Sequence, residues 1–90
     1  MPDIENFRPI PKDYQWAVMA APAYGVIAIA LGYVSGNQIT DIRATIERLP
    51  DGSWIWNLYD TSFRGNEPSA NLAKAAVKKH INYIKTIQTG

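Results

Sequence analysis

The stretch that decides the fold runs from Asp41 to Lys85 and reads DIRATIERLP DGSWIWNLYD TSFRGNEPSA NLAKAAVKKH INYIK. Residues 42–47 alternate apolar and polar side chains, which is the pattern of a half-buried strand. Pro50-Asp51-Gly52 supplies the fixed φ and the glycine that a chain reversal requires. Residues 54–59 are rich in aromatic and β-branched side chains, which suit a second strand. We therefore expect a hairpin here, followed by a short loop and one amphipathic helix.

The helix is expected to begin near Pro68 or Ser69, because proline suits the first helical turn and serine is a good N-cap. At about 100° per residue, one half of its surface carries the apolar positions. These are Leu72, Ala73, Ala76, Val77, His80, Ile81, Tyr83, Ile84 and Ile87. The opposite half carries a narrow stripe of Lys74, Lys78 and Lys85, with Lys79 beside it. Such a wide apolar half needs a packing partner, and we expect the preceding hairpin to be that partner.

Residues 16–34 contain no charge and are about as long as a membrane span. Pro22, Gly25 and Gly32 interrupt this segment, and basic residues flank it on both sides without a bias that would orient a span. A small membrane-anchored protein with residues 16–34 as the span is therefore the less favoured alternative.

The second half of the same segment alternates large and small side chains, which predicts a central strand over residues 24–35. Its alanine and glycine face is one that a helix can approach closely. For residues 11–21 we predict a short helix that begins near Pro11 and is stopped by Pro22. If residues 16–21 form a strand instead, the sheet has four strands and the only helix is the C-terminal one.

The expected fold is a small α+β domain in the order α-β-β-β-α, with a three-stranded antiparallel sheet and both helices on one of its faces. Ninety residues suffice for one modest core. Residues 1–11 hold three prolines and no periodic pattern, so we expect an extended N-terminal arm there and a single domain over residues 12–90.

The sequence offers little catalytic chemistry. The absence of cysteine excludes disulfides, thiolate metal sites and cysteine nucleophiles, and it suits a reducing cytoplasm. The only histidine, His80, lies at the centre of the apolar helical face, and we interpret it as structural. A phosphate-binding glycine loop, a nucleophile elbow and a metal-ligand spacing of carboxylates are all missing. We therefore expect neither an enzyme nor a bound metal or cofactor.

Recognition of a protein is the function that we prefer. Trp54, Trp56, Tyr59 and Phe63 are candidate aromatic anchors, and an exposed sheet edge could accept a strand from a partner. By analogy with small phage or mobile-element regulators, we expect a regulatory or inhibitory module. Its partner would be one macromolecule, or a second copy of the same chain in a homodimer.

The alternative function is nucleic-acid binding, of RNA in particular. Residues 1–67 hold five basic against eight acidic residues, whereas residues 68–90 hold four lysines and no acid, within a net charge of +1. The candidate phosphate contacts are Arg64, Lys74, Lys78, Lys79 and Lys85.

The order α-β-β-β-α resembles the double-stranded-RNA-binding domain. SANLAKAA at residues 69–76 is similar to that family's opening of its last helix, matching it at Ser69, Ala73 and Lys74. The two residues after Ser69 are alanine and asparagine, where the family usually places phosphate-binding lysines. Residues 35–40 also lack the family's Gly-Pro-x-His segment. The resemblance covers about half of the chain, and it implies the topology.

Overall fold

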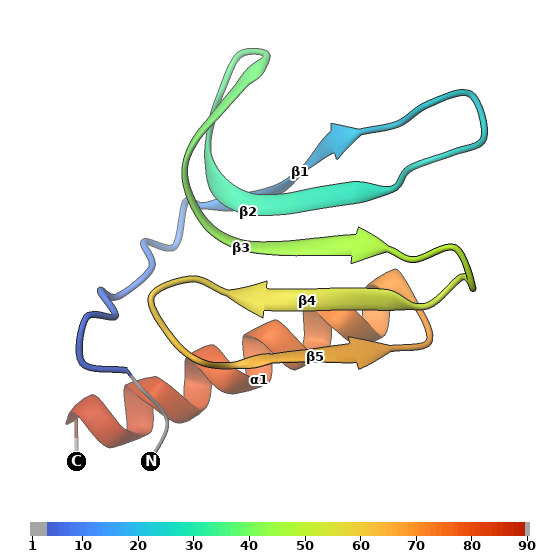
Figure 1. Cartoon of the computed structure of the whole chain (residues 1–90). Helices are drawn as coiled ribbons and strands as arrows, with labels where there is room; N and C mark the ends of the chain where they lie inside the picture. The colour runs from blue at the N-terminus through green and yellow to red at the C-terminus, as the bar shows by residue number, and fades with distance from the viewer. Residues whose placement is uncertain (1–3, 90) are drawn as a thin grey trace.

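The computed structural model describes residues 4–89 and shows five strands followed by one helix (Figure 1). These are β1 (Gln15–Ala20), β2 (Ala28–Ser35), β3 (Gln38–Arg48), β4 (Trp54–Leu58), β5 (Arg64–Glu67) and α1 (Ala70–Thr89). The strands form one antiparallel sheet in the order β1-β2-β3-β4-β5, so each strand pairs with the next in the chain. The expected α+β class is confirmed, and β1 and β5 are the edges of the described sheet.

The predicted order α-β-β-β-α is wrong in two places. Residues 15–20 form β1 rather than a helix, because Trp16 and Val18 pair with Leu31 and Ile29 of β2. Pairing along β2 also half-buries the Trp16 ring against the core, and this outweighs the local helix signals of the two prolines. The second error is β5, which occupies a segment that we expected to be a loop. The four-strand alternative is closer, but it lacks this strand as well.

The five-stranded sheet also bears on the membrane-span alternative and on the resemblance to the double-stranded-RNA-binding domain. The uncharged residues 16–34 form most of β1, a turn and most of β2, rather than one helix. Across residues 4–89, no helix is long and apolar enough to cross a membrane. The described chain also has five strands and no helix before them, so its topology differs from that of the double-stranded-RNA-binding domain.

The helix α1 covers one face of β3, β4 and β5 (Figure 1). Ile29, Ile46 and Trp56 pair across three neighbouring strands and therefore lie on this same face. The buried helix residues Ala73, Val77 and Ile84 complete the core, together with Leu31, Trp54 and Leu58.

Our expectation that a helix approaches the small face of β2 is wrong. Ala28 and Ala30 lie on the face away from α1, as their pairing with Glu47 and Thr45 shows. The helix covers the face that carries Ile29 and Leu31, because those larger side chains remove more apolar area from water.

The N-terminus of α1 is capped by Ser69. The Leu72 backbone N–H donates to Ser69 Oγ at 3.2 Å, and the Ala73 N–H donates to the Ser69 carbonyl at 3.0 Å. Of the two predicted starting points, Ser69 is therefore the cap, and Pro68 lies outside the helix.

Residues 4–11 contain neither helix nor strand and lie against the end of the helix. The Phe7 side chain is buried, and the Phe7 carbonyl accepts a hydrogen bond from Gln88 Nε2 at 3.1 Å. The buried Arg43 guanidinium lies 5.3 Å from the centre of the Phe7 ring and donates to the carbonyl of Arg8. Residues 1–3 of the predicted arm and Gly90 of the predicted domain are outside the described residues.

A bulge in β3 ties this arm to the sheet. Leu31 pairs with Ala44 but Tyr33 pairs with Thr40, so β3 carries two extra residues here. Within the bulge, Asp41 adopts a φ of 47° and accepts hydrogen bonds from the Tyr14 hydroxyl and from Arg8. The Tyr14 hydrogen bond is the main reason why the pKa of Asp41 lies below its usual range. The same bond is the main reason why the pKa of Tyr14 is raised.

Candidate functional site

Four aromatic side chains from three segments gather where α1 passes β5. The His80 ring of α1 lies 4.8 Å from the Trp56 ring of β4 and 4.7 Å from the Phe63 ring, measured between centroids. The Tyr83 ring meets Phe63 edge-on at 6.1 Å. These separations are those of favourable aromatic pairs. The four residues form what we call the aromatic cluster.

The connection between β4 and β5 places Phe63 in this cluster. The Thr61 hydroxyl donates to the Leu58 carbonyl at 2.6 Å and accepts from the Phe63 N–H at 3.0 Å. Asp60 adopts a φ of 62°, which reverses the chain, and the Leu58 N–H then donates to the Phe63 carbonyl at 3.1 Å. The polar residues of the loop therefore hold an apolar ring against the helix.

The histidine of the cluster is bound to its own helix. His80 Nδ1 lies 2.7 Å from the Ala76 carbonyl oxygen, four residues earlier. Because a carbonyl only accepts, Nδ1 must carry a proton, and in the neutral ring Nε2 then carries the lone pair. The ring is thus oriented by one hydrogen bond and by Trp56 and Phe63 on its sides.

A pocket of about 310 Å³ opens beside the cluster and is lined by Phe63, Lys79, His80 and Tyr83. Leu72, Tyr83 and Ile87 lie on the same flank of α1 and are 50%, 50% and 46% exposed. We call this surface the β5 groove, meaning the pocket together with Leu72 and Ile87. It is an apolar surface with one lysine at its margin.

The strand next to the groove, β5, is at the edge of the described sheet (Figure 1). The Leu58 N–H donates to the Phe63 carbonyl, so the backbone N–H and C=O groups of Phe63 point toward β4. Since backbone groups alternate along an antiparallel strand, the N–H and C=O groups of Arg64 and Asn66 point away from β4. Within the described residues, these groups form the free edge of β5.

The structure separates the four predicted aromatic anchors. Trp54 and Trp56 are buried on the helix-facing side of β4, where they form part of the core. Tyr59 is 43% exposed in the loop, and Phe63 is half-buried at the groove. Sequence reasoning did not select Leu72 and Tyr83 as surface anchors. The available signal was the width of the apolar half of the helix, which exceeds what one sheet contact can bury.

The five predicted cations lie on three different surfaces. The Lys74 Nζ lies 5.9 Å from the centre of the Trp16 ring, on the flank of α1 that also carries Lys78 and Lys85. Lys79 lines the β5 groove. Arg64 pairs with Asn57 and lies on the sheet face away from the helix. The arrangement therefore brings Lys74, Lys78 and Lys85 together but not the whole set.

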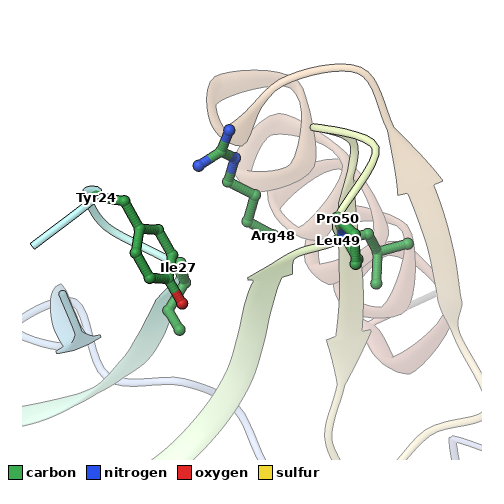
Figure 2. Close-up of a pocket in the computed structure, with 5 residues that line it drawn as sticks. All are labelled: Tyr24, Ile27, Arg48, Leu49 and Pro50. Atoms are coloured by element: carbon green, nitrogen blue, oxygen red, sulfur yellow. The ribbon is translucent and has the colours of Figure 1, made fainter. Parts of the chain in front are cut away.

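A second hollow, of about 510 Å³, lies between the β1–β2 and β3–β4 loops and is lined by Tyr24, Ile27, Arg48, Leu49 and Pro50. Figure 2 shows the Arg48 side chain rising between Tyr24 and the Leu49-Pro50 segment. Tyr24 is largely exposed, and four of the five lining residues lie in loops, since only Arg48 belongs to a strand. Three of the four residues that line the pocket of the β5 groove belong to α1, and a helix holds side chains more rigidly than a loop does. We therefore take the β5 groove as the candidate site.

In the described part of the chain, no three His, Asp or Glu side chains lie close enough together to hold a metal ion. Comparisons of the chain with protein-family models, with curated proteins and with solved structures found no match. The fold defines the class of the protein: over residues 4–89 it is a small α+β domain whose five-stranded antiparallel meander carries one C-terminal helix.

Proposed function

We propose that this protein is a non-enzymatic protein-binding module with a regulatory or inhibitory role, and that it binds through the β5 groove. The observation that carries the proposal is the half-exposed apolar flank of α1, on which Tyr83 lines the pocket and Leu72 and Ile87 lie further along the helix in either direction. Exposed apolar side chains that gather on one flank of a small domain are typical of interaction surfaces. The cysteine-free composition supports the cytoplasm as its location.

The chemistry of the groove suits a protein better than a small polar ligand. Tyrosine combines a large apolar ring with a polar tip, and it is enriched among residues that dominate binding energy. Phe63 and His80 provide a firm apolar floor because their rings are already packed together. The free edge of β5 adds backbone donors and acceptors, which an extended partner segment can satisfy.

Affinity purification from host lysate tests the proposal with three forms of the protein. We expect wild type and Tyr24→Ala to retain the same partner, and Tyr83→Ala to lose it while keeping a wild-type circular dichroism spectrum. Tyr24 is the matched control, because it is an exposed tyrosine outside the groove. Equal retention of the partner by Tyr83→Ala would overturn the assignment of the groove.

The same purification can instead recover nucleic acid, which would favour the lysine flank of Lys74, Lys78 and Lys85. Binding to duplex RNA would then weaken with salt, because bound lysines displace counterions from the phosphates. Lys78→Gln should lower the slope of log affinity against log salt by about one, whereas Lys79→Gln, on the other flank, should change it less. Retention of a protein that salt does not release would exclude this alternative.

A further inference from the structure

The edge of β5 is complementary to itself. In an antiparallel pair centred on Gly65, Arg64 of one copy faces Asn66 of the other, and the reverse pair is equivalent. These are the two residues whose backbone groups point outward, so this register satisfies the free edge in both copies. Gly65 faces Gly65 of the second copy at the centre, where the missing side chains allow close approach.

The two-fold axis through Gly65 also sets how the α1 helices of the two copies are aligned. Phe63 lies level with His80 and Tyr83, and α1 runs back along β5 (Figure 1). Gly65 is two strand residues further along, roughly 6.6 Å, which corresponds to about four helical residues toward the helix N-terminus. The axis through Gly65 therefore lies level with Val77 and Lys78 of α1. Leu72 and Tyr83 lie at about equal distances on either side of that level.

A second copy would consequently bring its Leu72 to the pocket beside Tyr83. Leu72 is half exposed in the single chain, and the pocket that it meets is lined mainly by aromatic rings. Glu67 of the second copy pairs with Phe63 in this register, which places a carboxylate next to Lys79 at the margin of the pocket. Apolar shape and opposite charge thus match at both ends of the interface.

We propose that the occupant of the β5 groove is a second copy of this chain, in a two-fold dimer that joins β5 to β5 and sets the two α1 helices antiparallel. The inference rests on the proposed function, because it names the partner of the same surface. The dimer would contain one continuous sheet, with both helices on one face, and the two edges β1 would remain at its ends.

Disulfide trapping tests the register, since the chain has no cysteine of its own. A mixture of Leu72→Cys and Tyr83→Cys proteins should form a cross-linked heterodimer under mild oxidation. Leu72→Cys alone should form little, because two Leu72 positions would be about 16 Å apart along the helices, too far for a disulfide. Lys78→Cys, on the opposite flank of α1, is the control and should also form little. Equal cross-linking in all of these samples, or none in the mixture, would overturn the proposal.

Sedimentation equilibrium of the full chain tests the dimer without cross-linking. At about 100 µM, wild type should be mainly dimeric if the Kd is roughly 10 µM or lower. Asn66→Pro removes an outward N–H but no hydrogen bond to β4, and it should weaken the dimer at least tenfold, with Asn66→Ala as its control. Tyr83→Ala should weaken it similarly. Dimers that are insensitive to both substitutions would overturn the proposed interface.

A monomeric wild type would also overturn the dimer, but not the proposed function. In that case, Tyr83-dependent capture of a different protein would still support the groove as a binding surface. Loss of both dimerisation and Tyr83-dependent capture would overturn the two proposals together.

Discussion

Replacing Gly65 with alanine tests how closely β5 packs against the aromatic cluster. An alanine Cβ at this position would lie 2.8 Å from Trp56 Nε1 and 2.9 Å from Trp56 Cε2, whereas ordinary contacts begin near 3.4 Å. The Trp56 ring has little room to move, because it is 3% exposed and rests against His80. Its Nε1 also donates to Glu67 Oε2 at 3.3 Å. The substitution must therefore displace either the ring or the strand.

The expected cost follows from two opposing effects. Overpacking a core position costs about 1–3 kcal/mol. Replacing glycine with alanine recovers about 0.4–1 kcal/mol where the backbone tolerates it, since the unfolded chain loses freedom. We therefore expect the free energy of unfolding to fall by about 1–2 kcal/mol. For a domain of this size, that corresponds to a fall in Tm of roughly 5–15 °C.

Thermal and urea unfolding, followed by circular dichroism and tryptophan fluorescence, would measure this change. All samples need one protein concentration, because self-association would add to the apparent stability. The control is Asn66→Ala, whose side chain is exposed on the other sheet face, and we expect it to change stability by about 0.5 kcal/mol or less. A Gly65→Ala protein as stable as wild type would refute the close contact between β5 and Trp56.

Three further measurements follow from the fold. Ser69→Ala should lower the free energy of unfolding by about 1 kcal/mol, because the Leu72 N–H loses its side-chain acceptor, and Ser69→Asp should restore most of it in urea unfolding. Ile84→Ala should cost about 2–5 kcal/mol in the same assay, since Ile84 is fully buried. In NMR titrations the Asp41 carboxyl should show a pKa below its usual range, and Tyr14→Phe should raise that pKa because the main hydrogen bond is lost. The stability that the ionised Asp41 contributes is fully present above the pKa that Asp41 has in the unfolded chain, and it is lost as the pH falls through the lower pKa of the folded state. Asp41→Asn should therefore lose less stability than wild type when the pH is lowered.

The hairpin and the helix of the C-terminal half could be predicted because their signals are local and agree with one another. Alternation in β3, the aromatic residues of β4 and the Ser69 cap all specify the observed elements. The region of β1 could not be predicted in the same way. QWAVMA has neither a clear helical period nor a clear strand period, so only its pairing with β2 decides its structure.

The strand β5 and the groove depend on contacts that are distant in the sequence. RGNE contains no apolar residue, and it forms a strand because Gly65 fits beneath the Trp56 ring and because β4 offers hydrogen bonds. The pocket exists because the loop returns Phe63 to His80 and Tyr83, which follow it by 17 and 20 residues. The sequence shows that these aromatic residues are present, but it does not show that they lie side by side in the fold.

The hydrogen bond between Gln88 and the Phe7 carbonyl joins a residue near the start of the described chain to one near its end. The first and last segments of the described chain lie at one corner of the molecule (Figure 1). A short linker could join them, and new ends could be opened in the exposed turn at Gly36 and Asn37, between β2 and β3. Such a circular permutant would place the β1–β2 hairpin after α1 in the chain while keeping every strand beside its present neighbour. The order of synthesis would change, and the architecture would not.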